Sequence, residues 1–340
     1  MALQAGFVHA DEVSRLFVAN SRGNNIVAYA EGDGRFLGEI VSEGSGGLHH
    51  PDTMLIGPDG KLYVSSGVSE KDSAILRFDP STGDFLGRFA QGNGMQRPYG
   101  IAFGPDGLLY VASFRTDRIM RFDGRSGAFH DVFAEGNGEP GGLNGPTGIT
   151  FGPDGALYVS TQGSVADAAG AVTYPGLPSQ VLRFDVDSGR SPVFIDQPEP
   201  STESGGSVSL LGVVFGPDCE RSVSNQCDIF VSDFLGGIRR YDRQGSLKAS
   251  LSTNYLGSGP GAHSVGGMTF GVSGQLYAAA FNRRHEKSAG AILRYGTTRN
   301  QADPTVNERI LPFVAETQSM ERPIGILAVP ASQVRAVTLQ

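Results

Sequence analysis

Side chains able to bind a metal ion or to transfer a proton are most concentrated in segment 49–52, which reads HHPD. His50 and Asp52 offer imidazole and carboxylate ligands for a divalent ion such as Ca²⁺, Mg²⁺ or Zn²⁺. Asp233 or His263 could complete the ligand set, and a histidine could instead act as a general base. The alternative is that His50 and Asp52 cap strand ends, because adjacent histidines have no diagnostic ligand spacing.

Asp233 and His263 are candidates because of the segments in which they lie. Asp233 follows the apolar strand expected at 228–232 and should point toward the end of a central channel. Its alternative role is a salt bridge or strand cap, since a buried acid needs a partner. His263 lies in the small-residue connection 261–264, which could bring it close to the axis; the alternative is a solvated loop histidine.

Arginine side chains form the third group of candidates. Arg97, Arg115 and Arg322 could each hold a carboxylate or sulfate through two parallel hydrogen bonds. Salt bridges to nearby acids such as Asp117 and Glu321 are the alternative. The predicted catalytic residues are His50, His263, Arg97, Arg115 and Tyr99, and the predicted metal ligands are Asp52, Asp233 and His50.

A repeated strand–turn–strand unit must position these residues, and it is clearest in segment 103–111, FGPDGLLYV. Pro105 fixes φ at the start of the turn, Asp106 can bond its own backbone, and Gly107 can take a positive φ. The following Leu-Tyr-Val leaves the turn as a strand. Copies begin at Ile56, Phe151, Phe215 and Phe270, the last two degraded.

The spacing of the copies predicts a propeller. The first turn glycines are Gly57, Gly104, Gly152, Gly216 and Gly271, at intervals of 47, 48, 64 and 55 residues. Each interval holds four short antiparallel strands, which is typical of a propeller blade. Because both ends of the chain fit the same phase, we expect one all-β domain over residues 1–340, with six blades; seven blades are the alternative.

The ring should close where strand 324–328 joins the remaining strands of the N-terminal blade. Segment 6–10 could compete for that place, and segment 334–339 could add one more strand. Two long insertions are expected, 162–179 between the second and third strands of the fourth blade and 198–209 in the connection to the fifth blade. The path of a propeller chain places both on one face and the Pro-Asp-Gly turns on the other, so we expect the site on the insertion-bearing face.

Charge and cysteine content limit the partners and the compartment. The 340 residues carry a formal charge of −8, without the basic face that nucleic acids or anionic membranes require, and no run of 18 apolar residues occurs. We expect a monomer that binds a small molecule or carbohydrate. Cys219 and Cys227, with seven residues between them, suit a hairpin disulfide, whereas two thiols alone make a poor zinc site.

A disulfide in turn suits an oxidising compartment. Segment 1–6 lacks the features of an intact signal peptide, so we expect a secreted or periplasmic protein without its leader. A cytoplasmic protein with two reduced thiols is the alternative.

Segments 98–112 and 118–123, with their equivalents in every interval, resemble six-bladed propellers of the NHL-repeat, SMP-30/gluconolactonase and streptogramin-lyase group. The resemblance implies a hydrolase or lyase acting at the channel mouth, with a divalent metal ion, or a non-catalytic binding propeller as the alternative. The lactonases hold metal at the residue before the glycine of Pro-x-Gly. That column here reads Asp52, Tyr99, Thr147, Leu211, Gly266 and Ile324, so one ligand is present.

The lyase pattern carries over no better. Its glutamate column reads Asn20, Ser66, Ser113, Thr161, Asp233 and Ala280, and the chain has no tryptophan where that family has one. Only Asp233 supplies an acid there. Neither family's full metal set transfers to this sequence.

Overall fold

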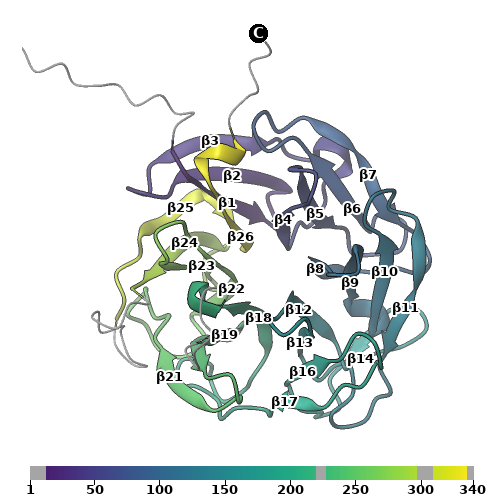
Figure 1. The fold of residues 1–340 in the computed structure, drawn as a ribbon. Coiled ribbons are helices and arrows are strands. Elements are labelled where there is room, and N and C mark those ends of the chain that lie inside the picture. The colour runs from purple at the N-terminus through teal and green to yellow at the C-terminus, as the bar shows by residue number, and fades with distance from the viewer. Residues whose placement is uncertain (1–12, 220–226, 297–308, 335–340) are drawn as a thin grey trace, which may run out of the picture.

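The structure, a computed structural model, describes residues 13–219, 227–296 and 309–334. Figure 1 shows six four-stranded antiparallel sheets around a central axis, which confirms the six-bladed prediction. The inner strands of neighbouring blades contact one another in a closed ring. No helix in the described part of the chain is long and apolar enough to cross a membrane.

Blades 2 to 6 are each built from consecutive segments of the chain. Blade 2 comprises β4 (Met54–Ile56), β5 (Leu62–Ser66), β6 (Ala74–Phe78) and β7 (Phe85–Gln91); blade 3 comprises β8 (Pro98–Phe103), β9 (Leu108–Ser113), β10 (Arg118–Asp123) and β11 (Phe129–Glu135). Blade 4 comprises β12 (Pro146–Phe151), β13 (Leu157–Thr161), β16 (Val181–Phe184) and β17 (Val193–Ile195). Blade 5 comprises β18 (Leu210–Phe215), β19 (Ile229–Asp233), β20 (Ile238–Tyr241) and β21 (Leu247–Leu251); blade 6 comprises β22 (His263–Phe270), β23 (Leu276–Asn282), β24 (Ala289–Tyr295) and β25 (Val314–Glu321).

Blade 1 joins the two ends of the described chain. Strand β26 (Pro323–Val329) pairs with β1 (Arg15–Asn20), which is followed by β2 (Asn25–Ala30) and β3 (Phe36–Val41). The purple and yellow strands lie side by side in Figure 1. The predicted closing strand 324–328 is therefore confirmed, whereas segments 6–10 and 335–339 lie outside the described residues.

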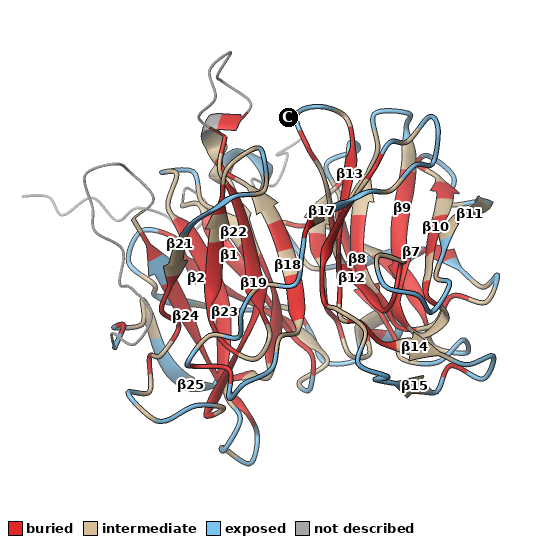
Figure 2. Ribbon diagram, turned by 90° about the horizontal axis from the view of Figure 1, so that it is seen from below, coloured by how far each residue is buried: buried red, intermediate tan, exposed pale blue. Residues whose placement is uncertain are grey.

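The repeated sequence unit packs one blade against the next. Tyr110, from the Leu-Tyr-Val strand of blade 3, meets Phe151 of blade 4 edge to face, with ring centroids 5.1 Å apart, and donates its hydroxyl hydrogen bond to Asp106. An edge-to-face aromatic pair contributes roughly 0.5–1.5 kcal/mol beyond its buried area. Equivalent pairs join Tyr63 to Phe103, Tyr158 to Phe215 and Phe230 to Phe270. Figure 2 shows the resulting burial as continuous runs along the strands.

A β-bulge interrupts most inner strands near the insertion-bearing face. In blade 3, Tyr99 and Gly100 lie opposite the single residue Ala112. Glycine is required there because a Cβ on Gly100 would lie 2.4 Å from the carbonyl oxygen of Thr147 on the next inner strand. Blades 4, 5 and 6 shift register at the same point. Because a bulge redirects a side chain, it places Tyr99 and its equivalents in the channel wall.

Both insertions lie where the sequence predicted them. Residues 162–179 separate β13 from β16 and include the hairpin β14 (Val165–Ala166) and β15 (Val172–Thr173); residues 198–209 precede β18. The turn between β18 and β19 begins with the short 3₁₀ turn η4 (Pro217–Cys219), and Cys219 forms the predicted disulfide with Cys227. The remaining 3₁₀ turns are η2 (Ser45–Gly47), η3 (Phe114–Thr116) and η5 (Ala331–Gln333).

Candidate functional site

A cavity of about 660 Å³ opens at the insertion-bearing mouth of the channel. Its wall combines residues from the inner strands with residues from both insertions. Below it, the channel between the inner strands holds a second space of about 460 Å³. Four residues line both spaces, and all belong to the Pro-x-Gly column or its equivalent positions: Asp52, Tyr99, Leu211 and Ile324. This ring is the throat between mouth and channel.

Asp52 is the one acid in the wall of the mouth cavity. Its side chain is 1 % exposed, and its Oδ2 lies 3.0 Å from Nη2 of Arg97. Among the described residues, neither carboxylate oxygen accepts a hydrogen bond of good geometry. Burial raises the pKa of Asp52 to about 6, against the attraction of Arg97 and Arg322. A carboxylate with this pKa can accept and return a proton near neutral pH.

Arg97 contacts both the Asp52 carboxylate and the aromatic ring of Tyr99. Its guanidinium carbon lies 4.9 Å from the ring centroid of Tyr99. Burial lowers the pKa of Arg97, but the charge of Asp52 and the Tyr99 hydroxyl raise it by more, so the net direction is upward. Arg97 and Asp52 are therefore a buried ion pair at neutral pH.

Arg322 also lines the mouth cavity, but in a different state. Its guanidinium lies about equally far from the rings of Phe234 and Phe281, 6.0 Å from each centroid. Within the described residues, it makes no ion pair and donates no side-chain hydrogen bond. Burial lowers its pKa below the usual value, yet a guanidinium stays charged at any physiological pH. The mouth thus has a positive charge without a matching carboxylate.

Three charged or titratable residues stand in a strained backbone conformation around this mouth. His50, Arg97 and Arg322 each immediately precede a proline at the entry to an inner strand, and their φ angles are 48°, 52° and 49°. Blade 4 uses Gly145 at the same place, with φ 63°. A left-handed φ costs a non-glycine residue roughly 1–2 kcal/mol. Because strain of this kind clusters at functional sites, the three side chains are candidates for a role beyond folding.

Aromatic rings also line the cavity. Phe114 meets Tyr99 edge to face at 5.0 Å. Tyr174, from the insertion hairpin, is 65 % exposed and donates a long hydrogen bond of 3.4 Å to Oε1 of Gln162. All four of these residues line the cavity. A wall of rings with a few convergent charges is typical of a small-molecule site.

His50 lies beside the site but is not part of the cavity wall. Its Nδ1 is 3.3 Å from Oγ of Ser21, and burial, with the charges of Arg97, His49 and Arg322, lowers its pKa to about 4. At neutral pH it is therefore uncharged. His49 contacts Asp72 instead, with 2.6 Å between Nδ1 and Oδ2.

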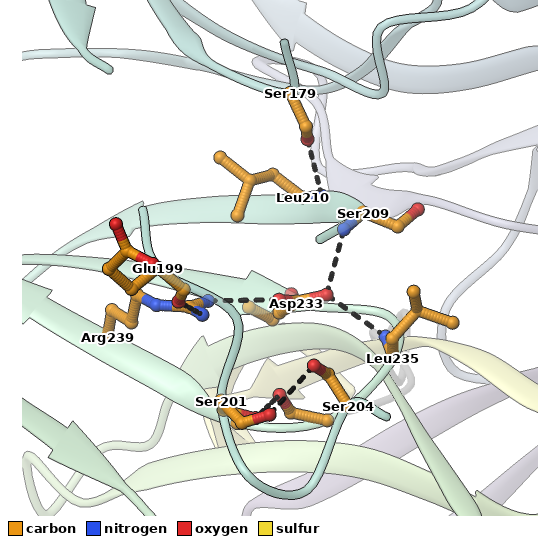
Figure 3. A network of polar contacts seen from close by, with 12 residues as sticks. Ser179, Glu199, Ser201, Ser204, Ser209, Leu210, Asp233, Leu235 and Arg239 are labelled. Carbon is orange, nitrogen blue, oxygen red and sulfur yellow. Dashed lines mark hydrogen bonds and ion pairs between the residues drawn. The ribbon is translucent and has the colours of Figure 1, made fainter. Parts of the chain in front are cut away.

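Asp233 is the centre of a network that fixes the second insertion (Figure 3). It is fully buried, pairs with Nη1 of Arg239 at 3.0 Å and accepts hydrogen bonds from the N–H groups of Ser209 and Leu235. Arg239 in turn donates to the carbonyl of Glu199. Burial raises the pKa of Asp233 against the opposing charge of Arg239. These contacts correspond to the strand-cap and salt-bridge alternative.

His263 is buried in a similar anchor. Its Nε2 lies 2.8 Å from Oγ1 of Thr253 and 3.6 Å from Oε2 of Glu203. Glu203 belongs to the second insertion and also accepts from Ser252 Oγ and the Thr253 N–H. Burial raises the pKa of Glu203, but hydrogen bonds from His263, Ser252 and Thr253 lower it by more, to about 2. His263 does not line the mouth cavity.

Arg115 lies in η3, half-buried and outside the cavity wall. Its neighbour Asp117 is buried and accepts hydrogen bonds from the N–H groups of Gly145 and Ala166. Burial raises the pKa of Asp117. Asp117 therefore attaches the first insertion to the rim instead of pairing with Arg115.

The predicted metal ligands do not gather into one site. Asp52 pairs with Arg97 and Asp233 with Arg239, so each carboxylate already faces a cation. Within the described residues, no group of three or more His, Cys, Asp or Glu side chains is arranged to hold a metal ion. This donor set does not fit a divalent ion, and metal binding remains a prediction from the sequence.

Two features of the site went unnoticed in the sequence. Glu203 lies in an insertion with no repeat to align it, and its side-chain partners are in the connection between blades 5 and 6 and at the start of blade 6. Serines on the second strands bridge neighbouring blades at the throat: Ser65 Oγ donates to the carbonyl of Tyr99, and Ser160 Oγ to that of Leu211. Ser232 does the same for Gly266. Their common phase was a signal that could have revealed them.

Comparisons with known proteins place the fold. No protein-family model matches the chain, and neither does any curated protein. A chain of the nidogen/laminin complex matches with a TM-score of 0.61 at 12 % identity, covering 94 % of this chain and 99 % of that one. The periplasmic gluconolactonase of Pseudomonas aeruginosa matches with 0.56 at 13 %, covering 94 % and 99 %. The virginiamycin B lyase of Staphylococcus aureus matches with 0.54 at 18 %, covering 95 % and 93 %.

The chain is a six-bladed β-propeller. Its structural neighbours include lyase and gluconolactonase propellers, in agreement with the resemblance seen in the sequence. At these identities the likeness extends to the fold, and propellers with one architecture carry many unrelated activities. The propeller's own mouth must therefore supply the argument about function.

Proposed function

We propose that this propeller is a hydrolase of a small lactone or ester, with Asp52 as the group that transfers the proton. The observation that carries the proposal is a fully buried carboxylate, raised in pKa to about 6, in the wall of a cavity of about 660 Å³. A general base is most effective when its pKa lies near the working pH. The cavity volume is within the range of small-molecule sites.

In the proposed reaction, ionised Asp52 removes a proton from water while the water oxygen adds to the substrate's carbonyl carbon. Negative charge develops on the carbonyl oxygen, and the Arg97 guanidinium stabilises it. The bond from the carbonyl carbon to the ring oxygen then breaks. Protonated Asp52 returns the proton to that oxygen, so that lactone and water give a hydroxy acid. No step requires a metal ion.

Hydrolysis is favoured over β-elimination because the described residues of the cavity wall include one carboxylic acid and no histidine or lysine. Elimination needs a base for the carbon-bound proton and an acid for the leaving group, usually two residues on different sides of the substrate. Hydrolysis can use a single carboxylate that first takes and then returns a proton. Asp52 fits this role, whereas Asp233 lies outside the wall and is committed to Arg239.

The test is a panel of neutral substrates, 4-nitrophenyl acetate, δ-valerolactone and glucono-δ-lactone, followed by absorbance or proton release. Loss of a general base typically lowers kcat/KM by about 10²–10⁴-fold, so Asp52→Asn should lose at least a hundredfold. Glu70→Gln, which changes an exposed carboxylate, should keep the wild-type rate. The rate should rise with pH through about 6. Wild-type rates in D52N, or no turnover of the whole panel, would reject the proposal.

A non-catalytic binding propeller is the second candidate. The aromatic wall and the incomplete lactonase and lyase ligand sets support it. In that case a ligand binds the mouth without turnover, and losses of affinity follow cavity-wall residues such as Tyr174 and Phe114. For either function we propose a secreted or periplasmic location, supported by the Cys219–Cys227 disulfide and by a periplasmic structural neighbour.

A further inference from the structure

Arg322 indicates which chemical class of ligand the mouth cavity binds. We propose that Arg322 binds a carboxylate group of the ligand, so that the substrate is an organic acid with an aromatic or otherwise apolar body. That the ligand is a substrate rests on the proposed function. The binding of its carboxylate by Arg322 does not require turnover.

In the described part of the chain, the Arg322 guanidinium lacks the carboxylate partner that buried arginines near the mouth have. The structure contains two buried arginine–carboxylate pairs near the mouth, Arg97 with Asp52 and Arg239 with Asp233. Arg322 has no such partner among the described residues, although it lies in the cavity wall. An arginine presents several donors in a planar fork that matches a carboxylate. Arg322 lines the space that a ligand would fill.

The charges in the cavity wall do not balance. The cavity wall contains two guanidinium groups, Arg97 and Arg322, against the single carboxylate of Asp52. The wall therefore carries one positive charge in excess when Asp52 is ionised. The chain as a whole carries a formal charge of −8, so this local sign is opposite to that of the protein. A ligand with one negative charge would neutralise the mouth.

The backbone of Arg322 has a conformation that does not need an arginine side chain. Its φ of 49° is one that glycine adopts at no steric cost, and the equivalent position of blade 4 is Gly145. The Arg322 guanidinium carbon lies 6.0 Å from the ring centroids of Phe234 and Phe281. Glycine would satisfy the turn, so the side chain's contribution is best sought in ligand binding.

The aromatic rings indicate the rest of the ligand. Phe114, Tyr99 and Tyr174 line the same cavity as Arg322 and can contact a flat apolar body. Phe234 lines the same cavity, with its ring centroid 6.0 Å from the guanidinium carbon of Arg322. A benzoate-like molecule combines both features in the smallest form.

The experiment compares benzoate with benzamide, which is a neutral molecule of nearly the same shape, by calorimetric titration. Charge-assisted hydrogen bonds are about twice as strong as neutral ones, and we expect wild-type protein to prefer benzoate by ten- to a hundredfold. In Arg322→Gln the preference should fall to about threefold or less, with benzamide affinity unchanged. Arg322→Lys should retain part of it, because the charge remains but the fork is lost.

Arg284→Gln is the matched control, since it removes the same charge from an exposed position outside the cavity wall. It should keep the full preference for benzoate. Circular dichroism of each variant establishes that it is folded. The proposal is overturned if benzoate shows no saturable binding at millimolar concentration, if wild-type protein does not prefer it to benzamide, or if R322Q keeps the preference. None of these outcomes depends on the hydrolysis of neutral esters by Asp52.

Discussion

Asp52→Asn should change the dependence of stability on pH in a way that few other substitutions in this chain would. The pKa of Asp52 is raised from 3.8 to about 6 in the folded protein because burial opposes ionisation. The folded state therefore holds the proton more tightly than the unfolded state. Stability from this group is fully present below pH 3.8 and is lost as pH rises to about 6.

The magnitude follows from the same two values. Each pKa unit corresponds to about 1.4 kcal/mol, so ionisation of Asp52 lowers the free energy of unfolding by about 3 kcal/mol above pH 6. Asparagine resembles the neutral acid in shape and never ionises. The stability of D52N minus that of wild type should therefore increase by about 3 kcal/mol between pH 3.5 and pH 7.

The assay is urea unfolding of both proteins at a series of pH values. Titration of groups that both proteins share cancels in the difference between their stabilities. Arg97 adds no pH dependence of its own, because its guanidinium stays charged throughout. A difference that stays flat would show that Asp52 is solvated and has an ordinary pKa. A difference that decreases with pH would show that the attraction of Arg97 outweighs burial. Either result would also remove the basis for Asp52 as a base near neutral pH.

Three further predictions concern the anchors and the strained rim. Glu203→Gln should destabilise the protein by about 3 kcal/mol at pH 7, because the Glu203 pKa is lowered from 4.5 to about 2 in the folded protein. In urea unfolding, this loss of stability should shrink as pH falls from 5 to 3. A loss that stays constant with pH would show that packing, and not the charge, is responsible. Replacing Cys219 and Cys227 by serine should cost about 2–3 kcal/mol, as expected for a short closed loop, with a loss below about 0.5 kcal/mol contradicting a structural role. Arg322→Gly should leave the free energy of unfolding in urea unchanged or raise it by up to about 1 kcal/mol. Relief of the left-handed φ should offset the packing that the side chain loses. A larger loss in R322G would mean that the fold, and not a ligand, needs the side chain.

The fold could be predicted from the sequence because the turn recurs in five of the six blades and both ends of the chain fit the same phase. Pro105, Asp106 and Gly107 have conformational preferences that hold without tertiary context, so their recurrence counted the blades and fixed the faces. The closing strand followed from the same phase, although its partner β1 is some 300 residues away along the chain.

The site could be predicted only where it follows that phase. Asp52 and Tyr99 occupy one column and Arg97 and Arg322 the position two residues earlier, so a ring of blades brings them to one mouth. Side-chain pairing is not periodic. The sequence could not show that Asp233 is matched by Arg239, because that choice depends on distances set by the whole sheet. For the same reason it could not show whether Arg322 finds a carboxylate.

The mouth cavity can form only after β26 has been synthesised and has closed the ring. Arg322 immediately precedes β26, the last strand that the structure describes, whereas Asp52 and Arg97 belong to blades 2 and 3, made much earlier in synthesis. A chain that lacks residues 322–329 lacks both the strand that closes the first blade and the cavity's second arginine. Assembly of the site is therefore tied to synthesis of β26: a chain cut before residue 322 would carry the proposed base without the group proposed to select its ligand.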